Sequence, residues 1–448
     1  MKPLETIPLF EPGTHDTIIA WRNDRPISRA ALLRDAGKLA EELPDRRWIA
    51  NCCVDRYNFL VCFTAALMLG RPSLLPNDFT KKVLTSLGRR YEQLLCLCDH
   101  PLGADGLEFR NIRFGGLGAG AIPAVPAPLA RRTAAIVFSS GSTGEPTPTE
   151  RTWKWLVAGA RLYAETLGLT QYAGFNIVAT VTSQHAFGLE GAIMLPLRYG
   201  AAVHTATLLF PEDIAAALGC VPAPRILITT PLHLRTIIES RLEMPPTAVV
   251  VSATAPLPVE LAARTESLFG ATVMEVYGCT EVGLIATRRT VEGEVWRLPR
   301  GLELRVDETN ASVIAPHIGA EVELSDTLEP LSDDTFLLHG RGADVVKIAG
   351  NRTSLSGLNT ILTGIPGVVD GTFFVPPGEE ATRVRRLTAF VVAPERNAKD
   401  ILHELRQNIA SVFLPRPLVL VSEIPRSISG KVLFADLLAL TKHASGSE

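Results

Sequence analysis

Long apolar runs, paired cysteines and net charge are all scarce in this sequence of 448 residues. The longest apolar run, FLVCFTAALMLG at 59–70, is shorter than the roughly 20 residues that cross a bilayer, so it predicts a buried helix and no membrane insertion. The seven cysteines are an odd number without CxxC spacing, which argues against a disulfide framework or a metal cluster. A net charge of −3 argues against general nucleic-acid binding.

The start of the chain, MKPLETIPLF, lacks the basic residues and the apolar stretch of a signal peptide. We therefore expect a cytoplasmic protein with free thiols. Hydrophobic residues make up 46% of the chain and charged residues 20%, which is typical of a soluble globular protein. A chain of this length is expected to form two or more domains.

Short β-rich runs alternate with helical runs along most of the chain, beginning with a helix that Ser28 is placed to cap. This alternation predicts an α/β fold with largely parallel sheets. The Gly/Pro/Ala-rich stretch 115–128 interrupts it and is typical of a loop or linker. From about residue 342 the pattern becomes a compact α+β one, so we predict a large multi-subdomain N-terminal domain over 1–341 and a small C-terminal domain over 342–448.

A polar loop follows an apolar strand in IVFSSGSTGEPTPTE, residues 136–150. Its glycines allow sharp turns, so that backbone N–H groups and hydroxyls can point at an anion. A Ser/Gly loop after a strand is also an ordinary turn, and the lysine of the P-loop pattern is absent, which argues against a kinase or a GTPase-like protein. The candidate anion-binding residues are Ser139, Ser140, Gly141, Ser142, Thr143 and Gly144.

Four further motifs follow this loop in a fixed order: SATAPLP, VYGCTEVG, SDTLEPLSDDTFLLHGRGADVVKIAGNR and IPRSISGK. Together with the loop they resemble the adenylate-forming superfamily, which comprises acyl-CoA synthetases, adenylation domains of peptide synthetases and luciferases. The resemblance extends over nearly the whole chain, as far as Lys431. It implies the adenylate-forming fold and a first reaction that joins a carboxylate to the α-phosphate of ATP and releases pyrophosphate.

The resemblance implies a role for each motif. Amides and hydroxyls of the loop would stabilise the charge of the triphosphate. In VYGCTEVG, Tyr277 and Gly278 would border the adenine, Thr280 would contact the α-phosphate, and Glu281 would bind Mg²⁺, which requires hard oxygen ligands. The alternative for this motif is a tyrosine at a strand end followed by a solvated glutamate.

Two other motifs supply nucleotide contacts by resemblance. Asp326 would accept hydrogen bonds from the ribose hydroxyls, and Arg341 would reach the ribose or a phosphate unless it is a surface arginine of a linker. The backbone of SATAPLP would border the adenine, although a strand-to-turn segment ended by prolines explains the same pattern. Its candidate residues are Thr254, Ala255 and Pro256.

The positive charge that the loop lacks is implied at Lys431. By resemblance this lysine is carried on the mobile C-terminal domain and bridges the attacking carboxylate and the α-phosphate. The domain would then swing and present another face, around KIAGNR, to guide a thiol to the acyl adenylate. A lysine in a polar loop is otherwise a solvated side chain.

The stretches GSTGEPTPTERTW and GVVDGTFFVPP resemble aryl acid ligases of aryl polyene and xanthomonadin pigment pathways. This resemblance implies a hydroxybenzoate-type acid and transfer to the phosphopantetheine thiol of an acyl carrier protein or of coenzyme A. His185 would lie near the carboxylate, while Phe187 and Gly188 would border the aromatic ring. His185 is equally well explained as a core residue.

Departures from the family pattern leave alternatives open. Thr147 stands where the family has a lysine, and Gly357 and Phe434 also depart, which suggests a nucleotide-binding regulator with reduced catalysis. Retention of Glu281, Asp326 and Lys431 argues against that alternative. A fatty acyl-CoA synthetase and a stand-alone amino acid adenylation enzyme are the alternatives within the superfamily.

A basic cluster in TRVRRL is a candidate contact for the phosphates of coenzyme A or for an acidic carrier protein. The alternative is a solvated strand edge. Its residues are Arg383, Arg385 and Arg386.

Overall fold

The computed structural model forms two compact units, unit 1 and unit 2. It describes residues 5–11, 13–117, 120–139, 147–307, 310–341, 345–348, 351–376, 386–426, 432 and 436–440. Unit 1 comprises Met1–Ala253, Val259–Glu292 and Ala315–Ala320, and unit 2 comprises Thr254–Pro258, Gly293–Ile314 and Glu321–Glu448. The predicted domain boundary after residue 341 stays a prediction. Within the described ranges, no helix is long and apolar enough to cross a membrane.

One sheet of unit 1 has the strand order β6-β5-β3-β4-β7-β8. Its strands are parallel except for the antiparallel pair β7–β8. The strands are β3 (Ile49–Asn51), β4 (Ser73–Leu75), β5 (Leu95–Cys98), β6 (Glu108–Asn111), β7 (Thr133–Ser139) and β8 (Thr147–Thr152). The helices of this part are α1 (Arg29–Glu42), α2 (Arg56–Met68) and α3 (Lys81–Arg90).

The second sheet of unit 1 has the order β14-β13-β12-β11-β9-β10-β1-β2. It is parallel from β13 to β1, and each end carries an antiparallel strand, so the predicted α/β class is confirmed. The strands are β1 (Ile18–Arg22), β2 (Arg25–Ser28), β9 (Asn176–Ala179), β10 (Ala202–His204), β11 (Arg225–Thr229), β12 (Val249–Ser252), β13 (Thr272–Cys279) and β14 (Gly283–Arg288). The accompanying helices are α4 (Trp153–Thr166), η1 (Leu169–Gln171), α5 (Ala186–Gly188), the π-helix η2 (Leu189–Met194), α6 (Leu195–Arg198), α7 (Pro211–Cys220), α8 (Pro231–Ser240), α9 (Val259–Phe269) and η3 (Thr290–Glu292).

Local signals explain the first helices. The Ser28 side chain accepts a hydrogen bond from the backbone N–H of Ala31, so the predicted N-cap of α1 is confirmed. The apolar run at 59–70 lies in α2, where every residue except Met68 is buried. One of them, Arg56, donates through its two Nη atoms to backbone carbonyls, among them that of Val181 at 2.8 Å. Burial of this helix on several sides explains why its apolar residues do not follow one stripe.

The stretch 115–128 contains no helix or strand where it is described, as its composition predicts. Its end nevertheless has a structural role. The backbone N–H groups of Ile7 and Leu9 donate to the carbonyls of Pro128 and Pro126, at 3.0 and 2.8 Å. The proline carbonyls thus accept hydrogen bonds from the N-terminal segment, which composition alone did not reveal.

Unit 2 contains short strands and short helices. The strand orders within it are β19-β20-β15, β16-β17-β18, β21-β22 and β23-β24-β25. The strands are β15 (Val295–Arg297), β16 (Glu303–Val306), β17 (Ala311–Ile314), β18 (Glu321–Leu324), β19 (Asp326–Pro330), β20 (Thr335–Arg341), β21 (Val345–Ile348), β22 (Asn351–Ser354), β23 (Asp370–Phe374), β24 (Thr388–Val392) and β25 (Leu418–Leu420). The helices are α10 (Leu355–Thr363), α11 (Ala398–Asn408) and the short η5 (Ser411–Phe413).

The α+β pattern that the sequence predicts near the C-terminus is confirmed by β23, β24, α11 and β25. These elements pack around an apolar core that includes Leu362, Phe373 and Leu405. Burial of this core is the main stabilising contribution in this part of the chain.

Candidate active site

The β7–β8 hairpin holds both ends of the predicted anion-binding loop. Ser139 is the last residue of β7, and its Cα partner is Thr147, the first residue of β8. The backbone therefore leaves and re-enters the sheet at adjacent positions. The other predicted loop residues lie outside the described ranges: Ser140, Gly141, Ser142, Thr143 and Gly144.

The β13–β14 hairpin carries the predicted nucleotide and metal residues. Tyr277 is half-buried near the end of β13, and Thr280 and Glu281 form the turn between the strands, with Glu281 exposed. The strands approach so closely that a Cβ at Gly278 would lie 2.2 Å from the carbonyl oxygen of Gly283. Because such contact is not sterically allowed, this approach requires glycine at position 278.

Two side chains bind the backbone carbonyls of this turn. The Arg151 guanidinium donates through Nη2 to the Thr280 carbonyl at 2.8 Å. Nε2 of His317 lies 3.4 Å from the carbonyl oxygen of Val282, an interaction that requires this nitrogen to carry the hydrogen. Trp155 packs against both, with the Arg151 guanidinium 4.6 Å from the centre of its ring. The turn is thus supported from the interior while Glu281 remains exposed.

Arg151 also forms a buried ion pair. Its Nη1 donates to Oε1 of Glu190 at 2.5 Å, and the two residues are only 1% and 4% exposed. The pair joins β8 to the π-helix η2. Gly283, with φ of +88°, lies against the same carboxylate, since a Cβ there would be 2.4 Å from Oε1 of Glu190. Burial, and secondarily the Glu190 carboxylate, raise the pKa of Tyr163.

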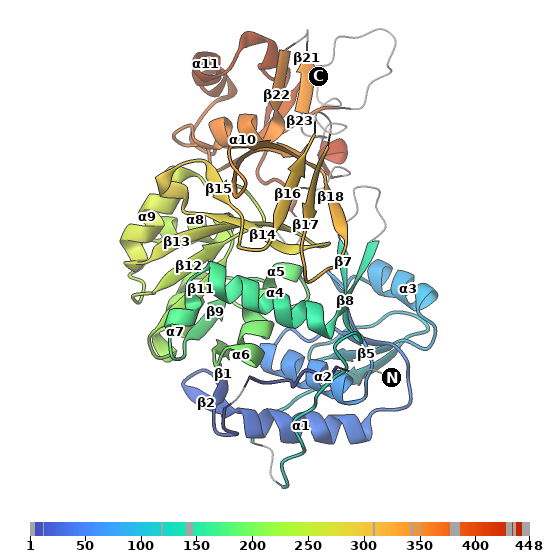
Figure 1. Cartoon of the computed structure of the whole chain (residues 1–448). Coiled ribbons are helices and arrows are strands. Elements are labelled where there is room, and N and C mark those ends of the chain that lie inside the picture. Colours follow the sequence, from blue (N-terminus) through green and yellow to red (C-terminus); the bar gives the residue numbers. More distant parts are fainter. Residues whose placement is uncertain are drawn as a thin grey trace. The chain divides into compact units, whose positions relative to one another are not determined.

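The predicted acid-binding segment begins directly before η2. Nδ1 of His185 accepts from the backbone N–H of Phe187 at 3.4 Å, so the ring caps the short helix α5. Phe187 is 8% exposed and belongs to the apolar core of unit 1. Gly188 lies against the backbone, where a Cβ would be 2.0 Å from the Thr182 carbonyl oxygen. Helices α4 and α5 both lie beside β14 (Figure 1). The roles of His185, Phe187 and Gly188 toward an acid stay predictions.

Unit 2 contains the remaining described candidates. Asp326 and Arg341 are Cα partners across the β19–β20 pair, so the structure brings these two positions together. Thr254 has a φ of +80°, an unusual value for a β-branched residue, and strain of this kind is concentrated at functional sites. The next two candidates, Ala255 and Pro256, are exposed.

Several predicted residues lie outside the described part of the chain: Lys431, Phe434, Arg383 and Arg385. Arg386 is described and exposed, and Gly357 lies on α10. The structure therefore gives backbone positions for part of the predicted site, and the roles of all the predicted residues remain predictions.

Burial raises the pKa of the Cys279 thiol to about 12, and the nearby Glu281 carboxylate adds to this effect. The thiol is therefore protonated at neutral pH and is a poor nucleophile. Its position in VYGCTEVG reflects packing. All seven cysteines are free, and five of them are buried.

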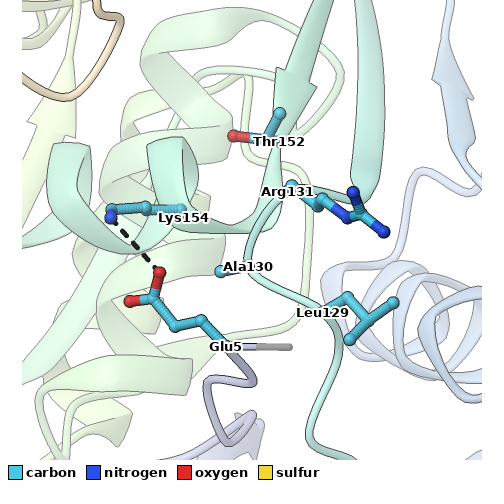
Figure 2. A pocket seen from close by; sticks show the side chains of 6 residues that line it. All are labelled: Glu5, Leu129, Ala130, Arg131, Thr152 and Lys154. Atoms are coloured by element: carbon cyan, nitrogen blue, oxygen red, sulfur yellow. Dashed lines mark hydrogen bonds and ion pairs between the residues drawn. The ribbon is translucent and has the colours of Figure 1, made fainter. Parts of the chain in front are cut away.

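A hollow of about 340 Å³ lies elsewhere in unit 1, beside the start of α4. It is lined by Glu5, Leu129, Ala130, Arg131, Thr152 and Lys154. Figure 2 shows the Lys154 ammonium directed at the Glu5 carboxylate, 3.4 Å away. None of the predicted nucleotide or acid residues lines this hollow, so it carries no part of the predicted chemistry.

Sequence reasoning missed Arg151 and Glu190, which connect the predicted segments. The signal for Glu190 was a lone carboxylate within the apolar run FGLEGAIMLPL, since a buried charge requires a partner. The partner itself, 39 residues away in the sequence, was not identifiable without the fold.

The Ser/Gly-rich sequence between β7 and β8 and the exposed carboxylate at the β13–β14 turn are features in which the chain resembles the adenylate-forming enzymes. The family model described as AMP-binding enzyme matches residues 84–335, more than half of the chain. The chain belongs to this family.

A 4-coumarate–CoA ligase of Rhodobacter capsulatus is 32% identical over 270 residues, which are 58% of this chain and 64% of that enzyme. A 3-hydroxybenzoate–CoA/4-hydroxybenzoate–CoA ligase of Thauera aromatica is 24% identical over 339 residues, 66% of this chain and 64% of that enzyme. The matched region thus spans 64% of the length of each relative. An o-succinylbenzoate coenzyme A synthetase of Bacillus subtilis, solved with ATP and magnesium, superposes with a TM-score of 0.80 at 16% identity, over 94% of this chain and 96% of that one. The chain therefore has the adenylate-forming fold.

Proposed function

We propose that the protein activates an aromatic carboxylic acid with ATP and Mg²⁺ and then transfers the acyl group to a phosphopantetheine thiol. An acid oxygen attacks the α-phosphorus, pyrophosphate leaves, and the thiol sulfur later displaces AMP from the acyl adenylate. The observation that carries the proposal is the Thr280–Glu281 turn, whose carboxylate is exposed while Arg151 holds the turn from within. Membership of the AMP-binding family supports it.

The donor set at the turn fits Mg²⁺. Glu281 offers an exposed carboxylate next to the Thr280 hydroxyl, and both are hard oxygen groups. A single exposed carboxylate suits Mg²⁺, which is usually bound by one or two carboxylates together with substrate phosphates and water. When bound, the ion would offset phosphate charge. Thr280 would orient the α-phosphate.

The acid is proposed to be of the hydroxybenzoate type. The names of the relatives support an aromatic acid, since one is a hydroxybenzoate ligase and the other a 4-coumarate ligase. The position of Phe187 beside His185 is compatible with a ring near the segment. A role in pigment synthesis is a narrower prediction, because neither relative is named for such a pathway. Coenzyme A and an acyl carrier protein are the two proposed acceptors.

Acid-dependent exchange of labelled pyrophosphate into ATP tests this proposal. We expect exchange with hydroxybenzoates that exceeds exchange with medium-chain fatty acids and with amino acids. Exchange only with a fatty acid or an amino acid would replace the proposed substrate. Acid-dependent formation of ADP and phosphate from ATP, without pyrophosphate exchange, would overturn the chemistry. Adding coenzyme A or a phosphopantetheinylated carrier protein to the preformed adenylate then identifies the acceptor.

Lys431 provides a sharper test of the first step. In Lys431→Ala, we expect adenylation to fall by about 100-fold or more, because a charge aimed at the transition state is lost. Binding of ATP to the variant should change little. Measured exchange at the wild-type rate in a folded Lys431→Ala protein would remove this lysine from the mechanism.

A further inference from the structure

We propose that Arg151 is a positioning residue for the nucleotide site, and that Glu190 fixes its guanidinium for this purpose. The inference rests on the proposed function and concerns residues that touch neither ATP nor the metal. The two side chains and the Thr280 carbonyl together are called the Arg151 bridge.

In the Arg151 bridge, the two Nη atoms of one guanidinium bind different partners. Nη1 donates to the Glu190 carboxylate at 2.5 Å, and Nη2 donates to the Thr280 carbonyl at 2.8 Å. The planar guanidinium has fixed donor directions, so fixing one side by an ion pair orients the other. Glu190 thus determines where Arg151 places its second donor.

A hydrogen bond to the Thr280 carbonyl restrains the orientation of the turn between β13 and β14. The peptide unit between residues 280 and 281 is planar, so its carbonyl oxygen and the Cα atoms of Thr280 and Glu281 lie in one plane. A hydrogen bond to the oxygen therefore limits rotation of the plane that carries both side chains. The Arg151 bridge thereby restrains the proposed metal ligand without occupying its exposed side.

The Arg151 bridge also connects three separate segments of unit 1. Arg151 follows the β8 end of the loop, and Glu190 lies two residues after Gly188 of the proposed acid segment. Gly283, which follows the turn, packs against the Glu190 carboxylate. A shift in any one segment is resisted by the others, because a buried charge cannot move to a site without its partner.

A second arginine of unit 1 provides a matched control. Arg198 is 4% exposed, pairs with Glu11, and donates through Nη1 to the Pro8 carbonyl at 2.5 Å. This arginine also binds one carboxylate and one backbone carbonyl, but Glu11 is 46% exposed and the pair holds the N-terminal segment. It is therefore expected to affect folding without affecting the Thr280–Glu281 turn.

The test compares two double variants, Arg151→Met/Glu190→Met and Arg198→Met/Glu11→Met. Removing both partners avoids an unpaired buried charge. Binding of ATP is measured by calorimetry with and without Mg²⁺, and folding by circular dichroism. We expect the Arg151/Glu190 variant to lose about tenfold of the affinity for ATP in the presence of Mg²⁺, a typical loss for a group that orients a metal ligand. Its affinity without Mg²⁺ should change less, and the control should match the wild type in both conditions.

Glu281→Gln completes the comparison. If the Arg151 bridge acts through Glu281, adding Arg151→Met/Glu190→Met to Glu281→Gln should produce little further loss of the Mg²⁺ effect. Arg151→Lys should retain only part of the Mg²⁺ effect on ATP affinity. The lysine ammonium keeps the positive charge but lacks the planar, two-sided donor geometry of the guanidinium.

A folded Arg151→Met/Glu190→Met protein with the wild-type response to Mg²⁺ would overturn the positioning role and leave the proposed function intact. Equal losses in the control would also overturn it, because the effect would then be general. If the wild type itself fails to bind ATP, both the proposed function and this inference are wrong.

Discussion

Unit 1 and unit 2 differ in what their interiors contain. Unit 1 buries ionisable groups as well as apolar ones: Arg29, Asp35, Arg56, Arg151, Glu190, Arg198, His204 and Glu275. In the described part of unit 2, the buried polar residues are Thr372 and Thr388, and the ion pairs retain solvent contact. Charges inside unit 1 fix the positions of loops and turns, whereas apolar packing is sufficient for the small sheets of unit 2.

Among the substitutions that test this difference between the units, Glu190→Gln is expected to cause the largest loss of stability. The change is nearly isosteric but leaves the buried guanidinium of Arg151 without an anion, so we expect a loss of about 3 kcal/mol in the free energy of unfolding. Urea unfolding followed by tryptophan fluorescence measures it, since Trp155 lies against Arg151. Exposed ion pairs contribute less than about 1 kcal/mol to the free energy of unfolding. A loss in that range for Glu190→Gln would show that burial does not determine how much the Arg151–Glu190 pair contributes to stability.

Acidification should destabilise unit 1 in particular, because unit 1 buries His204. Burial, and secondarily the nearby Arg56, lower the pKa of His204 to about 4 from 6.5. Between these values the unfolded chain binds a proton that the folded chain does not, so stability falls as the pH falls from 6.5 toward 4. His204 alone would contribute a loss of roughly 3 kcal/mol over this window.

His204→Gln removes this titration. Its unfolding free energy, measured by urea titration at several pH values, should decrease less on acidification than that of the wild type. Parallel pH profiles for the two proteins would contradict the buried, neutral state of His204.

The smallest effect is expected in unit 2. Glu404 accepts from Arg396 at 2.5 Å, but the two side chains are 34% and 23% exposed. Water screens such a pair, so Glu404→Gln should lower the free energy of unfolding by less than about 1 kcal/mol. Hydrogen exchange of the α11 amides gives the local value. A loss equal to that of Glu190→Gln would remove the distinction between the two units.

Local sequence signals predicted much of the fold. The Ser28 cap, the apolar run of α2 and the strands β23 and β24 depend on neighbouring residues, and the structure confirms them. The resemblance to the adenylate-forming superfamily directed attention to Asp326 and Arg341, whose backbone positions pair across two strands.

The supporting contacts of the site were not predictable in the same way. Arg151 meets Glu190 and Thr280 only after two sheets and a π-helix have formed, at sequence separations of 39 and 129. Similarly, the need for glycine at Gly278 arises from the opposing backbone of Gly283. Contacts of this kind depend on tertiary packing, which local patterns in a single sequence do not reveal.

The register of the β7–β8 hairpin has a consequence for loop engineering. Side chains on β8 alternate between the two faces of the sheet. The Arg151 side chain lies on the buried face, and its Cα partner on β7 is Ala135. Lengthening the loop before Thr147 would preserve this alternation, but one extra residue between Thr147 and Arg151 would direct the guanidinium to the opposite face. Loop grafts from relatives should therefore be joined upstream of Thr147.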